Sequence, residues 1–215
     1  MHLLSIQTGK PQTYGDPSSN SFLKREWTTG FYKAPVTGAV EVSTLGILGD
    51  GQADLANHGG EEKAICVYSA DHFPEWNTSL ALNMTAGAFG ENFTVDKASE
   101  KTVCLGDSYQ VGEVIVQVSQ PRQPCWKLAR RWQVKNLTAL VQENAKTGWY
   151  FRVLKAGTLE APAQIHLLDR PNEQWTIEAC NKVFYSKEKN LSKIRALANC
   201  SELSEAWKNS LLKKL

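Results

Sequence analysis

Short apolar stretches, interrupted by glycine and proline, fill the first 170 residues of the chain. Val40 and Val42 alternate with polar neighbours, and Val114 to Val118 alternates in the same way, which is typical of half-buried strands. Strands are predicted at 3–7, 64–68, 103–118, 149–154 and 164–168, helices at 71–82, 125–133 and 137–146, and a surface loop at 9–21. Many short strands with few helices predict a barrel or a sandwich.

Beyond residue 171 the pattern becomes purely helical. Apolar residues recur at helical spacing in 176–185, 192–199 and 203–212, and each stretch is too short to form a stable helix alone. We therefore expect them to pack on one another or on the barrel, as a simple cap or as a module that docks a partner. The predicted class is mainly β with helices (α+β), with a barrel domain at 1–170 and a three-helix domain at 171–215.

Composition narrows the possible functions. The 24 basic and 22 acidic residues give a formal charge of +2, so the chain as a whole shows no preference for nucleic acid or for a membrane surface. The N-terminal apolar run is too short for a signal peptide, and no stretch approaches the ~20 apolar residues of a membrane helix. Five cysteines without a CxxC pair suit a reducing compartment, and we expect a cytoplasmic monomer or homodimer.

Cys125 lies in the stretch SQPRQPCWKLARR at 119–131, between a predicted strand and a predicted basic helix. Pro121 and Pro124 end the strand and favour the first turn of a helix. The positive end of a helix, together with Arg122 and Lys127, favours the thiolate form of Cys125. A thiolate at this corner is suited to metal ligation or to nucleophilic attack. The alternative interpretation is that Cys125 is an inert buried thiol.

Three glycine-rich islands, at 49–64, 87–93 and 105–107, add backbone N–H groups that suit an anion. No Walker loop or GxGxxG fingerprint occurs. His58 precedes Gly59 and Gly60, where the backbone allows close approach of a ligand, and Lys63 supplies a charge for phosphate. His58 could equally be a structural residue, Cys66 is interpreted as a small core residue, and the histidines and cysteines lack the paired spacing of structural zinc sites.

Taken in order, these motifs resemble the MOSC domain family and its YiiM-like bacterial branch. The matching stretches are YKAPVTGAV at 32–40, LGDGQADLANHGG at 48–60, GAFGENFTV at 87–95, LGDSYQVGE at 105–113, SQPRQPCWKLARR at 119–131 and TGWYFRVL at 147–154. The three-helix tail is similar to the C-terminal helical domain of that branch. One departure is Glu61, which stands where many relatives have proline after the HGG motif.

The resemblance implies a MOSC-type β-barrel that binds a molybdenum–molybdopterin cofactor, with Cys125 as the thiolate ligand of the metal and the catalytic residue. It implies an oxidoreductase that reduces N-hydroxylated compounds, such as 6-N-hydroxylaminopurine, to amines. Because no flavin or haem motif is evident, a separate electron-donor reductase is expected. The residues expected to bind the cofactor are Lys33, His58, Gly59, Gly60, Lys63, Asn92, Ser119, Arg122 and Lys127.

Two other functions remain open from the sequence. A non-catalytic carrier would hold the cofactor, or a persulfide on Cys125, for delivery to another enzyme. A cysteine hydrolase would pair Cys125 with His58, and Glu61 or Glu62 would orient the imidazole.

Overall fold

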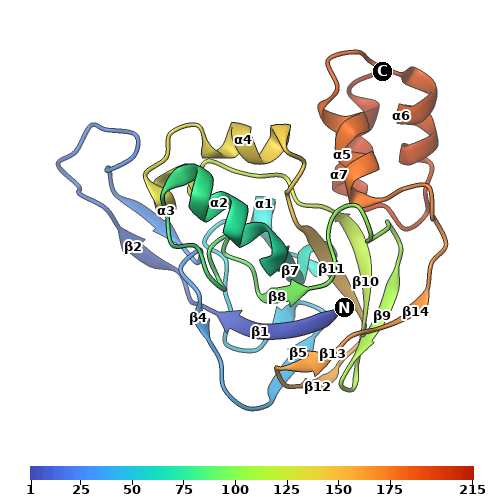
Figure 1. Cartoon of the computed structure of the whole chain (residues 1–215), viewed down its shortest axis with the longest axis horizontal. Helices are drawn as coiled ribbons and strands as arrows, with labels where there is room; N and C mark the ends of the chain where they lie inside the picture. Colours follow the sequence, from blue (N-terminus) through green and yellow to red (C-terminus); the bar gives the residue numbers. More distant parts are fainter.

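The computed structural model describes residues 1–215 and is built around a nine-stranded sheet that curls into a half barrel (Figure 1). The strand order is β13-β1-β8-β7-β11-β10-β9-β14, and β4 pairs with β1. The strands are β1 (His2–Thr8), β4 (Ala34–Pro35), β7 (Ile65–Ser69), β8 (Phe93–Asp96), β9 (Ser108–Val111), β10 (Val114–Pro121), β11 (Trp149–Lys155), β13 (Ala163–Gln164) and β14 (His166–Asp169).

The inner face of this sheet carries the main hydrophobic core. On β10, Val114, Val116 and Val118 all point into a cluster of 23 buried residues, as their alternation predicts. β10 pairs with β9 on one side and with β11 on the other, both antiparallel. A smaller sheet of β12 (Gly157–Leu159), β5 (Val40–Ser43) and β6 (Gly46–Ile47) adds Val40, Val42 and Ile47 to the same core.

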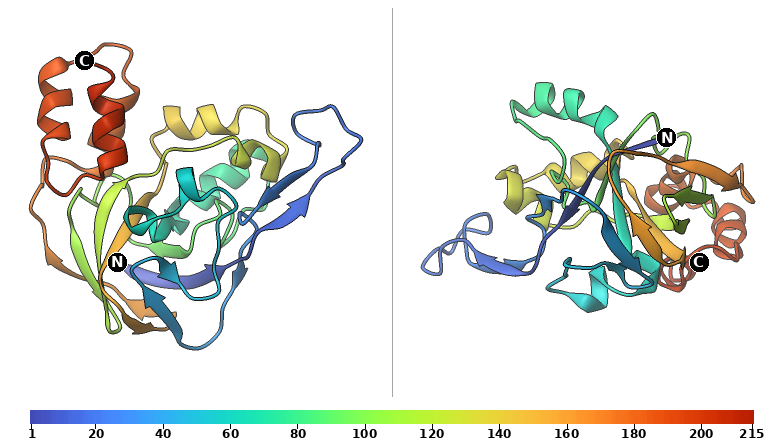
Figure 2. Two further views of the ribbon diagram at one scale, coloured as in Figure 1. Left: turned by 180° about the vertical axis from the view of Figure 1, so that it is seen from behind. Right: turned by 90° about the horizontal axis from the view of Figure 1, so that it is seen from below.

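A two-stranded hairpin, β2 (Gln12–Tyr14) and β3 (Trp27–Thr29), projects from the barrel (Figures 1 and 2). The prediction of a surface loop at 9–21 is therefore wrong for β2. No apolar alternation marks this strand in the sequence, because Gln12 and Thr13 are polar and exposed and only Tyr14 is half-buried. Its cross-strand hydrogen bond between the hydroxyls of Thr13 and Thr28 is 2.9 Å long.

Helices α2 (Phe73–Leu80), α3 (Lys127–Trp132) and α4 (Leu137–Glu143) enclose a second, aromatic-rich core of 11 buried residues. At its centre the rings of Tyr68 and Phe89 stack with centroids 3.7 Å apart. The short helix α1 (Leu55–His58) and the 3-10 turns η1 (Glu61–Lys63) and η2 (Ala70–His72) precede α2 in the chain. α1 and α3 both lie close to the end of β10.

The tail forms α5 (Ile177–Tyr185), α6 (Leu191–Ala198) and α7 (Glu205–Leu212), which lie together at one end of the molecule (Figures 1 and 2). They share a core of eight buried residues, and Leu105 from the β-rich part belongs to it. The side chains of Thr176, Asn190 and Ser204 cap the three helices. The prediction of a mainly β, barrel-like fold followed by three helices is confirmed, whereas the division into two domains after residue 170 stays a prediction.

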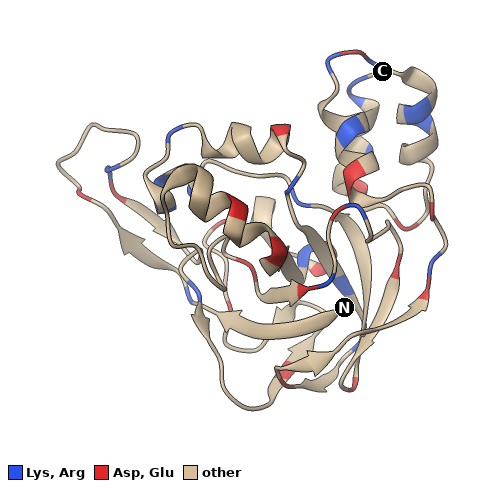
Figure 3. Cartoon of the chain, viewed as in Figure 1, with Lys and Arg blue, Asp and Glu red and all other residues tan.

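Charged side chains of both signs are spread over both parts of the chain (Figure 3). None of the helices has the length and apolar character required to span a membrane.

Candidate functional site

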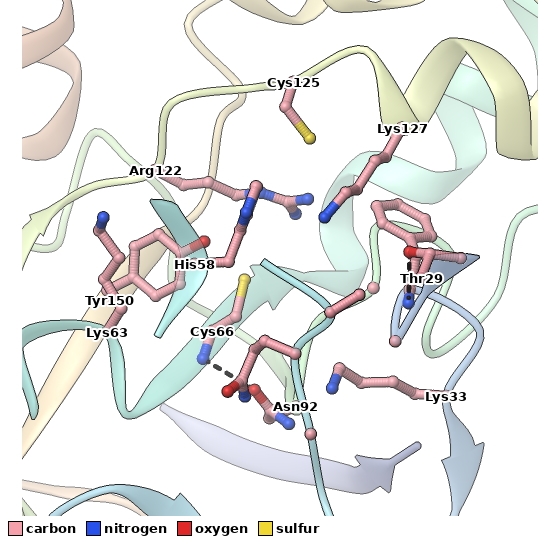
Figure 4. Close-up of a pocket in the computed structure, with 16 residues that line it drawn as sticks. Thr29, Lys33, His58, Lys63, Cys66, Asn92, Arg122, Cys125, Lys127 and Tyr150 are labelled. Carbon is pink, nitrogen blue, oxygen red and sulfur yellow. Dashed lines mark hydrogen bonds between the residues drawn. The ribbon is translucent and has the colours of Figure 1, made fainter. Parts of the chain in front are cut away.

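A pocket opens between the end of β10, α1 and the base of the hairpin (Figure 4). It brings together residues from all along the chain. The lining residues are Thr29, Gly30, Phe31, Lys33, Gly51, Gln52, Ala53, His58, Lys63, Cys66, Gly90, Asn92, Arg122, Cys125, Lys127 and Tyr150. Seven of the predicted site residues are among them: Lys33, His58, Lys63, Asn92, Arg122, Cys125 and Lys127.

Cys125 lies in the connection between β10 and α3, and its thiol points into the pocket (Figure 4). The predicted helix at 125–133 starts later than expected, at Lys127. The carbonyl of Cys125 accepts hydrogen bonds from the Leu128 amide at 3.2 Å and from the Thr138 hydroxyl at 3.0 Å. Cys125 therefore precedes the helix in a turn that α4 helps to fix, and it is not itself a helical residue.

Arg122 is the most unusual charge in the pocket. Its side chain is 5% exposed and forms no ion pair, and Nη1 has no hydrogen-bond partner. Burial lowers the pKa of Arg122, whereas Cys66, Tyr150 and Cys125 raise it in their ionised forms, and the net shift is upward. At neutral pH the guanidinium is charged because the ordinary pKa of arginine already lies far above 7. A buried cation without a counterion costs free energy unless a ligand supplies the opposite charge.

Lys127 adds a second unpaired cation. The residue is 7% exposed, and its ammonium takes part in none of the ion pairs of the protein. His58 lies nearby on α1. Burial lowers the pKa of His58 to about 4, and the positive charges of Lys127 and Arg122 add to the effect, whereas Asp54 opposes it. His58 is therefore neutral at pH 7. An anion bound between these groups would be attracted by two positive charges.

The role predicted for Lys33 changes in this environment. Its ammonium forms an ion pair with Asp50, and both side chains are almost fully buried. The other oxygen of Asp50 accepts a 2.8 Å hydrogen bond from the amide of Asn92, whose own oxygen accepts from the Cys66 backbone N–H at 3.1 Å. Lys33 thus contributes little net charge to the pocket. Together with Asp50 it fixes Asn92 in the pocket wall.

Lys63 lies at the opposite edge, where its ammonium donates a 2.7 Å hydrogen bond to the Asn57 carbonyl. Burial lowers the pKa of Lys63, and Asp54 opposes this shift. The acids next to it in the sequence do not enter the pocket. Glu62 pairs with Arg152, and Glu61 is exposed.

Ser119, Gly59 and Gly60 do not line the pocket. The buried hydroxyl of Ser119 donates to the Glu62 carbonyl at 2.6 Å and also contacts the Tyr150 carbonyl at 3.2 Å, which ties β10 to η1. Gly59 caps α1, and a side chain there would meet Leu55. Gly60 has a φ of +89°, a conformation that favours glycine and lets the chain turn from α1 into η1.

Nine lining residues were not among the predicted site residues, and two of these nine, Cys66 and Tyr150, carry ionisable groups. Cys66 on β7 and Tyr150 on β11 are paired across the sheet, and both side chains reach the pocket (Figure 4). Cys66 was interpreted as a core residue, and every residue of β7 is buried, so alternation could not show which face it occupies. Burial raises the pKa of the Cys66 thiol and that of the Tyr150 phenol, so both groups remain protonated at neutral pH.

No group of three or more His, Cys, Asp or Glu side chains is arranged to hold a metal ion. The pocket instead combines one accessible thiol with two unpaired cations. This donor set suits an anionic cofactor whose metal needs a single protein ligand, and it does not suit a free metal ion.

Two family models match this chain. Residues 54–166 match the MOSC domain, and residues 175–215 match the YiiM-like 3-alpha helix domain. The chain belongs to the MOSC domain family. The resemblance inferred from the sequence motifs is thereby confirmed.

Relatives match over nearly the full chain. An uncharacterized protein of Bacillus subtilis, YflK, is 42% identical over 99% of this chain and 93% of its own length. Protein YiiM of Escherichia coli is 31% identical over 98% of this chain and 91% of its own length. A protein of Gibberella moniliformis named "Reductase" is 33% identical over 94% of this chain, which corresponds to 37% of that longer protein.

Solved structures of YiiM proteins have the same fold as this chain. YiiM from Geobacillus stearothermophilus superposes with a TM-score of 0.82 at 36% identity, with 99% of this chain and 98% of that chain covered. YiiM from Escherichia coli superposes with a TM-score of 0.79 at 25% identity, with 100% of this chain and 92% of that chain covered.

Proposed function

We propose that this MOSC protein uses a molybdenum–molybdopterin cofactor to reduce N-hydroxylated compounds, such as 6-N-hydroxylaminopurine, to amines. The observation that carries the proposal is the pairing of a pocket-facing thiol, Cys125, with a buried and unpaired guanidinium, Arg122. The first group can ligate a soft metal, and the second needs an anion.

The pocket fits such a cofactor by charge and by donor set. Arg122 and Lys127 would hold the pterin phosphate, with Lys63 at the edge of the same pocket. Cys125 would be the single protein ligand of molybdenum. When bound, the cofactor supplies the electron transfer for the overall reaction R–NHOH + 2 e⁻ + 2 H⁺ → R–NH₂ + H₂O.

The other lining groups prepare the pocket for this chemistry. Asn92 is fixed by Asp50 and offers its amide at the pocket wall. Tyr150 and Cys66 stay protonated and are therefore hydrogen-bond donors at neutral pH. His58 stays neutral and can accept a hydrogen bond from a ligand without adding a further positive charge.

Electrons have to come from a second protein, because the chain has no motif for a flavin or a haem. A relative of this chain is named "Reductase", which supports a redox reaction.

The first experiment measures molybdenum and pterin in protein purified from a host that makes the cofactor, together with turnover of 6-N-hydroxylaminopurine driven by reduced methyl viologen. Cys125→Ala should abolish turnover, whereas Cys200→Ala, which removes a half-exposed thiol of the helical tail, should not. A protein that carries neither molybdenum nor pterin would refute the proposal, as would full activity of Cys125→Ala. Transfer of cofactor or sulfur to another enzyme without turnover would instead indicate a carrier.

A further inference from the structure

An exposed aromatic pair lies where the loop of the β2–β3 hairpin meets α3. Phe22 is 40% exposed and Trp126 is 42% exposed, and their rings meet edge to face with centroids 6.4 Å apart. Large aromatic side chains that are grouped and exposed are typical of the centre of a protein–protein interface. We call the surface formed by the hairpin loop and α3 the hairpin–α3 face.

Contacts between the hairpin loop and α3 hold this pair in place. The guanidinium of Arg130 lies 4.6 Å from the Trp126 ring centroid and 5.0 Å from that of Phe22. Arg130 also donates to the Arg25 carbonyl at 3.4 Å, and Gln133 donates to the Leu23 carbonyl at 2.9 Å. The loop is therefore fastened to α3, so a partner would meet an aromatic surface that is already ordered, which lowers the entropic cost of binding.

The charge around the aromatic pair is predominantly positive. No acidic residue occurs between Glu113 and Glu143, a stretch that includes all of α3 (Figure 3). Five basic residues in this stretch form no ion pairs: Arg122, Lys127, Arg130, Arg131 and Lys135. Arg122, Lys127 and Arg130 are buried, so Arg131 and Lys135 are the ones that a partner can reach.

The hairpin loop adds exposed Lys24 and Arg25 to the half-exposed Arg131 and the exposed Lys135 of the α3 side. The loop also carries Asp16 and Glu26, and Asp16 is engaged with the Ser18 amide at 2.9 Å and its hydroxyl at 2.6 Å. Cations therefore outnumber acids on the hairpin–α3 face, and an acidic partner surface would be complementary to it.

The face adjoins the proposed catalytic pocket. Trp126 follows Cys125 directly in the chain, and the residues after β3, Gly30 and Phe31, line the pocket. A protein bound on Trp126 would lie one residue away from the thiol that we assign to molybdenum.

We propose that the hairpin–α3 face is the docking surface for an acidic electron-carrier protein that contains a flavin or an iron–sulfur cluster. This inference rests on the proposed reductase function. The carrier would deliver the two electrons that each N–OH group consumes, either as one pair or in two single steps. A nucleic acid is the less favoured occupant, because Arg130 covers one face of the Trp126 ring, on which a base would otherwise stack.

The test compares two electron sources for the same cofactor-loaded enzyme. Reduced methyl viologen is small and needs no docking surface. A flavodoxin and a [2Fe–2S] ferredoxin, each reduced by NADPH through its own reductase, are acidic proteins that need one. Three enzymes are compared with the wild type: Trp126→Ala, the double variant Lys24→Glu/Arg25→Glu, and the control Lys101→Glu, which reverses an exposed charge outside the face.

We expect turnover with at least one of the carriers to fall about tenfold in Trp126→Ala and in the double variant, and to be unchanged in Lys101→Glu. Added salt should slow the wild type with that carrier, and should slow the double variant less. Turnover with methyl viologen should stay within about twofold in all variants, which also reports that each is folded and loaded.

Three results would overturn the docking proposal: wild-type turnover with methyl viologen but with neither carrier, carrier-driven turnover unaffected by the two face variants, or equal losses with both kinds of donor. Tight binding of single-stranded oligonucleotide that Trp126→Ala abolishes, without an effect on carrier-driven turnover, would assign the face to nucleic acid. Absence of turnover with methyl viologen in the wild type would instead refute the underlying function.

Discussion

The ammonium of Lys33 is paired with the carboxylate of Asp50, and both side chains are almost completely buried, with 5% and 4% of their surface exposed. Asp50 also accepts hydrogen bonds from the Gly9 amide and from the side chain of Asn92. One carboxylate thus joins the residue that follows β1, the 48–60 motif and the wall of the pocket.

Asp50→Asn should destabilise the protein strongly, because it leaves the Lys33 ammonium buried without a counterion. Breaking a buried ion pair by removing one partner typically costs about 3–5 kcal/mol. Urea denaturation followed by circular dichroism would measure the change, with the exposed Asp169→Asn as the matched control. The double variant Lys33→Met/Asp50→Asn should recover much of the loss, and a double variant as unstable as Asp50→Asn would contradict this account.

Arg122→Met should have opposite effects on the empty and the loaded protein. Without a ligand, the guanidinium is a buried charge with an unpaired Nη1, so its replacement should raise the free energy of unfolding by about 1 kcal/mol. The same change should remove most of the pterin retained on purification, because a charge-assisted contact to phosphate is lost.

Arg152→Met is the comparison for Arg122→Met. Arg152 is paired with Glu62 and also donates to the Glu202 carbonyl at 2.8 Å, so its loss should destabilise the protein without ligand. Equal destabilisation by the two substitutions would show that the Arg122 charge is already satisfied within the protein.

His58 should titrate well below the ordinary range of a histidine side chain. Its pKa is lowered from 6.5 to about 4 by burial and by the charges of Lys127 and Arg122. In the cofactor-free protein, ¹H–¹⁵N NMR should therefore show a neutral imidazole throughout the range from pH 8 to 5, and the spectrum of His58→Gln would assign the signal. Added inorganic phosphate should raise the midpoint, because an anion in the pocket stabilises the imidazolium.

The lowered pKa of His58 also makes the stability of the protein depend on pH. A histidine with a lowered pKa binds its proton more readily in the unfolded chain, so the stability it contributes is complete above pH 6.5 and is lost as the pH falls towards 4. His58→Gln should remove this part of the acid sensitivity. A midpoint near 6.5 in the free protein, or an unchanged pH profile in His58→Gln, would contradict the assigned environment.

Sequence patterns with one apolar face were sufficient to predict many of the helices and strands. The apolar spacing of Ile177, Cys180 and Phe184 predicted α5, and the alternation of Val114 to Val118 predicted β10. Each pattern is local, so it can be detected without knowing what the segment packs against. The polar hairpin strand β2 carries no such pattern, and a loop was predicted in its place.

The site was predictable where a charged residue or a cysteine directly follows the end of a strand, as Arg122 and Cys125 do. The pairing of side chains from distant segments could not be predicted from the sequence. Asp50 and Lys33 are 17 positions apart, and nothing in either motif shows that they neutralise each other. Ser119 matches a site motif, yet its hydroxyl hydrogen-bonds to backbone carbonyls of η1 and β11 and does not reach the pocket. Cys66 lies on a strand that is buried on both faces, so the sequence could not assign its thiol to the pocket or to the core.

Alkylation of the cofactor-free protein should modify Cys125 before any other thiol. Cys125 is half-buried at the pocket, whereas burial raises the pKa of the Cys66, Cys104, Cys180 and Cys200 thiols and disfavours their reactive thiolates. With limiting iodoacetamide at pH 8, peptide mapping by mass spectrometry should find Cys125 modified about tenfold faster than Cys200, the other half-buried thiol.

A loaded cofactor should protect Cys125 and leave the slow modification of Cys200 unchanged, because only the former faces the pocket. This contrast separates a ligand role from simple accessibility: a thiol that is merely exposed reacts equally in the loaded and the empty protein, whereas a metal ligand loses its reactive lone pair on binding. Equal rates for Cys125 in both forms would exclude it as the ligand even if the purified protein contained molybdenum.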